Sequence, residues 1–226
     1  MKTQSTRTTL MAAGLVFLLA ACASDPSIDT RAEAKNDAGL YPVEGGRIDE
    51  AFVDIETDFK GFKQVHVAAL DTSIVEVDYE AESHEWRSRD WQLSDKDKAG
   101  LIEMFKKSVT SKFDVEGISL TDTPAAGVLV VEPTLKKLEP VAPKDNFSDR
   151  SPGDKYFSEG AGKVTLEFTF KDGATGKVIA TAVDRRDAGT QWQENSAIHN
   201  RWEVQRLFNR WISMFDSSLE RVQQAQ

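Results

Sequence analysis

A strict two-residue alternation across residues 163–171 constrains the fold more than any other feature of the sequence. Its apolar members would share one face of a β-strand, and the charged residues and threonines between them would share the other. The apolar members are Val164, Leu166, Phe168 and Phe170. Turn-forming residues follow at 172–176, and a second apolar run returns over 178–183. The pattern predicts an antiparallel β-hairpin over 164–183.

Two segments with helical spacing flank this hairpin. Ser94 and Asp97 resemble a capping box at the start of a first helix, and Gly117 can end that helix. Its apolar positions are Leu101, Ile102, Phe105, Val109 and Phe113. A second helix is predicted over about 199–223. Its apolar stripe consists of Val204, Phe208, Trp211, Phe215, Leu219 and Val222.

Further strands are predicted from local patterns. Residues 65–69 alternate, and residues 128–131 form a continuous β-branched run whose regular pairing Pro133 should close. Extra strands are expected near 51–55 and 73–79. The principal elements follow the order β-α-β-β-β-α. Two helices on one face of a mainly antiparallel sheet predict an α+β fold, a two-layer sandwich.

The first 21 residues have the pattern of a secretory signal peptide. A basic start with Lys2 and Arg7 precedes an apolar run that is too short to span a bilayer. Leu19-Ala20-Ala21-Cys22 resembles the lipobox of bacterial lipoproteins. That resemblance implies thioether attachment of a diacylglycerol to Cys22, cleavage before it and acylation of the new N-terminus. Because Ala23 is not Asp, resemblance to the sorting rule of many Gram-negative lipoproteins implies an outer-membrane anchor facing the periplasm.

The mature chain would be acidic and would contain one folded unit. It would carry 26 basic against 37 acidic residues, a formal charge of −11, which argues against a nucleic-acid partner. Residues 22–46 predict the lipidated Cys22 and a flexible tether, because few of them are large and apolar. Residues 47–226 predict a single globular α+β domain. Cys22 is the only cysteine, so no disulfide can stabilise the domain.

Several segments together resemble a family of uncharacterised bacterial lipoproteins that carry a domain of unknown function. They are the Phe62-x-x-Val65-x-Val67 strand, the 162–168 strand, the Asp172-x-x-Thr175-Gly176 turn, Val183-Asp184-x-Arg186 and the aromatic-rich last helix. The resemblance covers about residues 40–222. It implies an envelope location and the fold described above, and it transfers no active-site residue.

The sequence contains no local motif for catalysis. His66, His84 and His199 are not spaced as metal ligands, and lipidation of Cys22 would leave no thiol. No serine lies in a Gly-x-Ser-x-Gly turn, and the Gly173–Lys177 stretch lacks the spacing of a phosphate loop. We therefore expect neither an enzyme nor a metal or cofactor site. An envelope-polymer hydrolase that pairs carboxylates from distant segments is the alternative.

Two segments are candidates for function. Residues 79–91 place two tryptophans and two arginines close together, a composition typical of contact surfaces. The predicted contact residues are Trp86, Arg87, Arg89 and Trp91. The competing interpretation is a lid whose rings pack on the sheet. Residues 140–161 are either functional or disordered. The leading hypothesis is a binding or structural module of the cell envelope, held to a membrane by the lipid on Cys22 and contacting an envelope protein.

Overall fold

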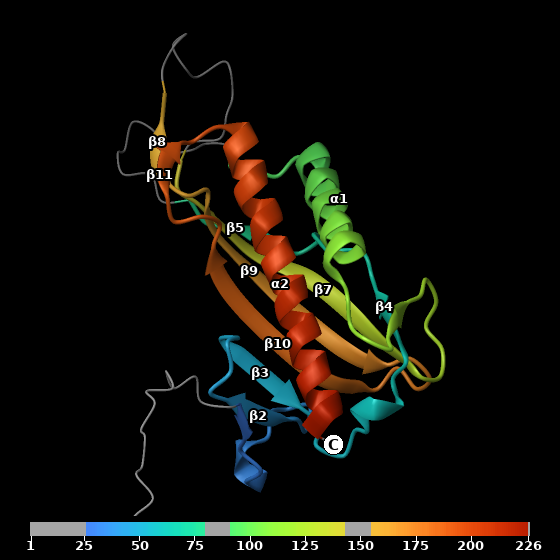
Figure 1. Ribbon diagram of the computed structural model, residues 1–226. Coiled ribbons are helices and arrows are strands. Elements are labelled where there is room, and N and C mark those ends of the chain that lie inside the picture. Colours follow the sequence, from blue (N-terminus) through green and yellow to red (C-terminus); the bar gives the residue numbers. More distant parts are fainter. Residues whose placement is uncertain (1–25, 80–90, 143–154, 226) are drawn as a thin grey trace, which may run out of the picture.

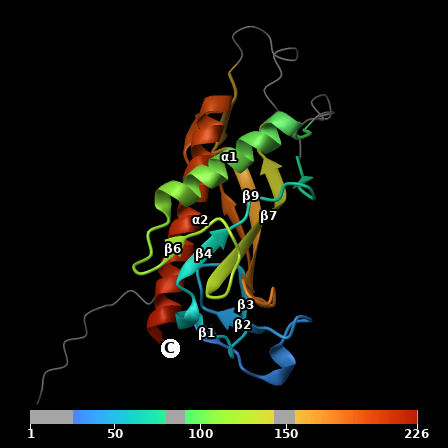
Figure 2. The same ribbon diagram turned by 90° about the vertical axis from the view of Figure 1, so that its right-hand side faces the viewer.

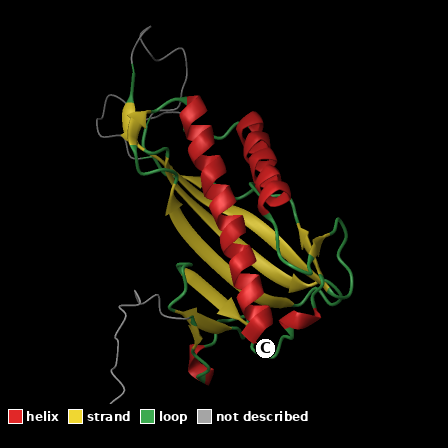
Figure 3. Ribbon diagram, in the orientation of Figure 1, coloured by secondary structure: helices red, strands yellow, loops and turns green. Residues whose placement is uncertain are grey.

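The computed structural model describes residues 26–79, 91–142 and 155–225. They form a nine-stranded sheet with two long helices on one face, as Figure 1 shows. The helices are α1 (Asp95–Lys112) and α2 (Ala197–Ala225). Figure 3 shows the two layers by colour, with both red helices over the yellow sheet. The predicted α+β two-layer sandwich is confirmed.

The sheet is mixed but mainly antiparallel. Its strands are β1 (Ser27–Ile28), β2 (Tyr41–Glu44), β3 (Glu50–Val53), β4 (Gln64–Val67), β5 (Glu76–Val77), β6 (Ser119–Leu120), β7 (Val128–Pro140), β9 (Gly162–Asp172) and β10 (Val178–Asp187). They pair in the order β1-β2-β3-β10-β9-β7-β4-β6, and β5 also pairs with β7. Only the pairs that involve β4 or β5 run parallel among the named strands. A separate ribbon joins β8 (Phe157–Glu159) to β11 (Trp192–Glu194).

The predicted hairpin is the centre of the sheet. β9 and β10 pair antiparallel, with Phe168 opposite Ala182. The Asp172 side chain fixes the turn by accepting the backbone N–H groups of Ala174 at 3.0 Å and Thr175 at 2.8 Å. The alternation also holds, because Val164, Leu166 and Phe168 are buried against the helices.

Aromatic side chains join the sheet to both helices. Phe105 of α1 lies with its ring centroid 6.5 Å from that of Phe168 and 5.4 Å from that of Phe208 on α2. Further along α2, Phe215 stacks on Phe170 with centroids 5.7 Å apart. Phe105 and Phe208 are almost completely buried. Packing of this kind supplies most of the stability of a domain without disulfides.

The predicted helix signals are largely confirmed. Asp97 N–H donates to the Ser94 hydroxyl at 3.2 Å, and Ser94 N–H donates to the Asp97 carboxylate at 2.9 Å, which completes a capping box. The role predicted for Gly117 is wrong, because α1 ends at Lys112, five residues earlier, and Gly117 lies in the following turn with φ of 75°. On α2 Phe208, Trp211 and Leu219 of the stripe are buried, Val204 and Phe215 are partly buried, and Val222 is 37% exposed.

The structure corrects the prediction that Pro133 ends regular pairing. β7 continues through Pro133 to Pro140 and pairs with β9 along its length. The Pro133 carbonyl accepts the N–H of Asp71 at 2.9 Å, on the side away from β9. Since N and O of one strand residue point to the same side, the missing N–H of Pro133 costs the β7–β9 ladder no hydrogen bond.

The structure also corrects part of the predicted tether. Within residues 22–46, β1 and β2 pair with each other and β2 pairs with β3, so this stretch extends the sheet. Leu40, just before β2, is 2% exposed, so this stretch also buries a large apolar side chain. Asn36 stabilises the turn before it by accepting the backbone N–H groups of Ala38 and Leu40, both at 3.0 Å.

The face of the sheet away from the helices is polar. Ion pairs cross between neighbouring strands, Lys171 to Glu132 at 2.6 Å and Lys136 to Glu167 at 2.9 Å. At one end of the sheet, the Gln223 amide of α2 donates to the carbonyls of Phe59 and Phe62, both at 3.1 Å. Figure 2 shows β1, β2 and the last turn of α2 together at this end.

Candidate functional site

The histidines and the acidic side chains do not assemble into a metal centre. Among residues 26–79, 91–142 and 155–225, no group of three or more potential ligands could hold a metal ion. His66 Nδ1 lies 3.1 Å from the carbonyl of Thr121, and the exposed His199 lies 2.9 Å from the carbonyl of Glu194. His84 lies outside the described residues, as does Cys22. No helix in the described part of the chain is long and apolar enough to cross a bilayer.

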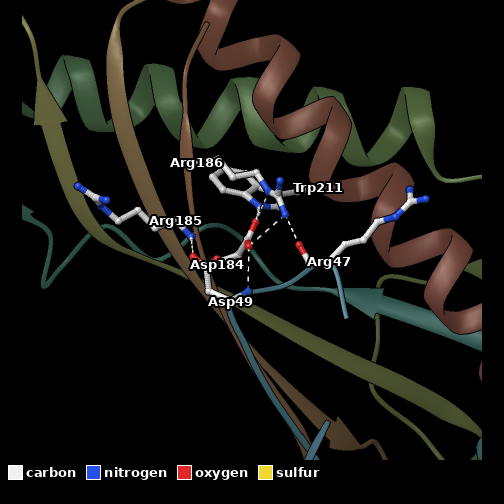
Figure 4. Close-up of polar contacts among 6 residues, drawn as sticks. All are labelled: Arg47, Asp49, Asp184, Arg185, Arg186 and Trp211. Atoms are coloured by element: carbon white, nitrogen blue, oxygen red, sulfur yellow. Dashed lines mark hydrogen bonds and ion pairs between the residues drawn. The ribbon is translucent and has the colours of Figure 1, made fainter. Parts of the chain in front are cut away.

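A buried carboxylate marks the junction of β10 with α2. Asp184 is fully buried, and Figure 4 shows its contacts. Its Oδ2 accepts the indole N–H of Trp211 at 2.6 Å and the Nε–H of Arg186. Its Oδ1 accepts Arg186 Nη2 and the backbone N–H of Asp49, both at 3.2 Å. The carboxylate is therefore both charge-paired and fully hydrogen-bonded.

The same cluster extends into the segment before β3. Arg186 Nη2 also donates to the carbonyl of Arg47, and the Asp49 carboxylate accepts the backbone N–H of Arg185 at 2.8 Å (Figure 4). Both oxygens of Asp184 already accept hydrogen bonds from the protein, so neither is free to contact a substrate. We interpret the cluster as a set of structural contacts that holds α2 against the sheet. This gives the Val183-Asp184-x-Arg186 motif a structural reason.

Two hollows bear on the hydrolase alternative. A mainly apolar groove of about 270 Å³ lies between α1 and the sheet at β4 and β6, and Asp122 is its one acidic residue. Polysaccharide hydrolysis normally uses two carboxyl groups. A polar hollow of about 200 Å³ contains Asp54 and Glu56. Lys177 bonds to Asp54 at 2.6 Å and lowers the pKa of that carboxyl, whereas a general acid needs a raised pKa.

Large exposed apolar side chains gather at the opposite end of the molecule, where α2 begins. We call this group the aromatic end: Phe157, Trp192, Ile198 and Trp202. Trp192 is 73% exposed, Trp202 70%, Ile198 68% and Phe157 51%. In Figure 1 the β8–β11 ribbon and the first turn of α2 project together beyond the main sheet. Exposed aromatic groups of this size are typical of contact surfaces.

The aromatic end rests on a polar support. Phe157 faces Glu194 and Trp192 faces Glu159 in the ribbon, so Phe157 and Trp192 share its outer face. The inner face carries Ser158, whose hydroxyl accepts the Asn195 amide at 2.8 Å. The Asn195 amide oxygen in turn accepts the Asn200 amide of α2 at 2.9 Å. These bonds hold the ribbon to the helix and limit the conformational entropy that would be lost when a partner binds.

The predicted contact residues are only partly visible. Trp86, Arg87 and Arg89 lie outside the described residues. Trp91 is half-buried, and its indole N–H donates to the carbonyl of Ala142 at 2.8 Å. The contact at this segment stays a prediction. Of the segment 140–161, residues 157–159 form β8, and residues 143–154 lie outside the described residues.

Sequence reasoning missed the aromatic end, although one signal was available. Trp202 lies off the apolar stripe of the last helix, two residues before Val204, and a large apolar residue on the polar side of an amphipathic helix indicates a contact. Trp192 carried no comparable signal, because its exposure depends on the pairing of β11 with β8.

Comparison with solved structures finds proteins of low identity. They include the PelC dodecamer from Paraburkholderia phytofirmans, at 10% identity and TM-score 0.35, covering 68% of this chain and 89% of that one. A DUF330 protein from Xanthomonas campestris has 8% identity and TM-score 0.42, covering 73% and 87%. A minor lipoprotein from Acinetobacter baumannii has 12% identity and TM-score 0.31, covering 70% and 94%. At these values the structures support no inference about function.

No curated protein matches the chain significantly. The family model described as "Protein of unknown function (DUF3313)" does match, over residues 51–215. This match covers well over half of the 226 residues and confirms the predicted resemblance to a family with a domain of unknown function. The chain therefore belongs to the DUF3313 family.

Proposed function

We propose that this protein is a lipid-anchored, non-catalytic binding module of the cell envelope, and that its aromatic end contacts a protein partner. The observation that carries the proposal is the exposure of Trp192 and Trp202, at 73% and 70%, on a hydrogen-bonded support. Burying such rings at an interface typically contributes more than about 2 kcal/mol each when they are hot spots.

The path of the chain supports this placement of the contact surface. Cys22 precedes Ser27, the first residue of β1, by five positions, so a lipid on it would attach within about 18 Å of β1. α2 has 29 residues and is therefore about 43 Å long, and it runs from the aromatic end to the end that holds β1 and β2. A lipidated Cys22 would leave the aromatic end free to project away from the anchor.

We propose a non-catalytic role because the hydrogen bonds and ion pairs of the acidic side chains are made within the protein. Asp184 is saturated by donors, and Asp54 is paired with Lys177. An acid–base pair needs one carboxyl group with a raised pKa facing another across a substrate. Neither hollow in the described part of the chain offers that arrangement.

The contact is tested by combining Trp192→Ala with Trp202→Ala in the full-length chain. Because both rings are largely exposed, the melting temperature should change by no more than about 1–2 °C. A photo-crosslinker placed at Ile198 in intact cells should capture a protein from the wild type and at least tenfold less from the double variant. Val222→Ala, an exposed apolar change at the far end of α2, is the matched control. Equal capture by wild type and double variant would refute the contact.

The anchor is tested separately. Cys22→Ser should abolish incorporation of labelled palmitate and leave an uncleaved precursor or a protein released from the membrane. Ala23→Asp should keep the label but move the protein to the inner-membrane fraction. Normal maturation of Cys22→Ser, or an unlabelled wild type, would exclude the anchor, and an unchanged location of Ala23→Asp would exclude the proposed sorting.

A further inference from the structure

The exposed side of α2 combines the aromatic end with a row of arginines. Trp202, Arg206 and Arg210 lie four residues apart, so they occupy one side of three successive turns. Arg201 is exposed beside Trp202, and the exposed Arg206 side chain is 69% accessible. The row thus continues the aromatic end along the helix.

Two of the three acidic side chains of α2 are withdrawn from this surface. Glu203 is 6% exposed and bonds to Gln193 at 3.2 Å, and Asp216 is 8% exposed. The third, Glu220, is half-buried and lies near the other end of the helix. Arg206 contacts Glu203 at 3.3 Å. Within the described part of the chain, Arg201 and Arg210 form no ion pair. The outer side of α2 from Trp202 to Arg210 is therefore cationic, although the whole chain has a formal charge of −9.

We infer that the partner presents an acidic protein segment, with apolar side chains against Trp192 and Trp202 and carboxylates along Arg206 and Arg210. This inference rests on the proposed function of the aromatic end. Guanidinium groups bind carboxylates through paired hydrogen bonds, and such complementarity selects a partner and speeds encounter. The mixture of Trp and Arg is also the composition of hot spots between proteins.

An anionic membrane or glycan is the less favoured occupant. The lipid on Cys22 would attach at the opposite end of α2, so the anchoring membrane does not lie against this surface. The ribbon also places the acidic Glu159 beside Trp192, on its outer face. An extended anionic polymer or lipid surface would meet that charge, whereas a protein segment can place its carboxylates along α2 alone.

The experiment uses the full-length chain in its own cells, with a photo-crosslinking phenylalanine analogue at Trp202 or, in a second strain, at Arg210. Both positions should capture the same protein, and mass spectrometry should place the Arg210 crosslink in a peptide with excess Asp and Glu. Arg206→Glu with Arg210→Glu should reduce capture from Trp202 at least tenfold, because each reversal replaces attraction with repulsion. Arg221→Glu, a reversal at the far end of the same helix, should change capture less than twofold.

The outcomes separate this inference from the proposed function. Capture of a protein from Trp202 that the double charge reversal leaves unchanged would preserve the proposed function and overturn the acidic partner. Capture from Arg210 of a neutral or basic peptide, a lipid or a glycan would also overturn it. If Trp202 captures no protein, the proposed function fails and this inference with it. In isolated membranes, raising NaCl from about 50 to about 500 mM should reduce capture at least about fivefold, because salt screens exposed charges.

Discussion

Two buried aspartates at α2 have contrasting surroundings. Asp184 of β10 contacts the helix, and Asp216 belongs to it. Asp184 receives hydrogen bonds at both oxygens, including those from the Arg186 guanidinium. Asp216 accepts one backbone N–H, from Asp114 at 3.2 Å, and its Oδ1 has no partner within the described residues. Burial therefore raises the pKa of Asp216 to about 6, and the nearby charge of Glu220 adds to the rise.

The contrast shows that burial alone does not decide what an acid does for a fold. A buried charge with full hydrogen bonding fixes one arrangement of the elements around it, whereas a buried charge without partners opposes folding. Asp184 joins β10, α2 and the segment before β3. Asp216 of α2 accepts the N–H of Asp114, just after α1, and this one bond does not offset the burial that disfavours its charged form.

The largest expected effect is at the paired aspartate. Asp184→Ala would leave the Arg186 guanidinium and the Trp211 N–H without their acceptor, so unfolding free energy should fall by about 3–5 kcal/mol. Urea denaturation of the full-length chain measures this fall. Asp187→Ala removes an exposed acid from the same strand and should change stability by less than about 0.5 kcal/mol. Similar losses of stability for the Asp184→Ala and Asp187→Ala variants would mean that the cluster in Figure 4 does not stabilise the fold.

A smaller effect isolates one bond of that cluster. Trp211→Phe keeps a buried aromatic ring but removes the N–H that donates to Asp184 at 2.6 Å. Hydrogen bonds to charged groups contribute about 1.5–3 kcal/mol, and stability should fall by about that amount. Trp202→Phe, at a ring that is 70% exposed, serves as the control and should be nearly neutral. A neutral Trp211→Phe would assign the tryptophan to packing alone.

The last expected effect has the opposite sign, a gain in stability. Because the pKa of Asp216 is raised on folding from 3.8 to about 6, its contribution to stability is fully present below about pH 4 and is lost as pH rises through 6. Asp216→Asn removes the charge and should be more stable than the wild type above pH 6, by no more than about 3 kcal/mol. Melting temperatures across pH 4–8 test this, and the difference between the two proteins should disappear near pH 4. A constant difference at all pH values would exclude titration of Asp216 as its cause.

What was predictable from the sequence was local. The β9–β10 hairpin and the Ser94 capping box depend on residues within a few positions of one another, and both are confirmed. The pairing of β1 with β2 was missed because it joins residues 27–28 to residues 43–44, a contact that the composition of the intervening segment does not reveal. The Asp184 cluster was likewise hidden, since it joins Asp184 to Asp49 and Trp211 across 135 and 27 positions. Whether a charge is paired depends on such long-range contacts, which composition does not reveal.

The candidate site was harder to predict than the fold. Tryptophans among charges directed attention to Trp86 and Trp91, but clustering in sequence is not exposure in space. Trp192 and Trp202 lie ten positions apart, and their side chains are both exposed at the end where β11 leads into α2. Their exposure at this end depends on the tertiary arrangement, which the sequence does not reveal.

The β8–β11 ribbon has a consequence for the order of folding. Its strands are far apart in the chain, Glu159 pairing with Trp192, but they directly flank the β9–β10 hairpin. Once Lys163 and Asp187 are paired, only the short connections between the hairpin and the ribbon strands remain to be closed. The ribbon can therefore form late in folding with a small loss of loop entropy. The same reasoning makes it the first part to open. Amide hydrogens in β8 and β11 should then exchange faster than those in β9 and β10, while the core of the sheet stays folded.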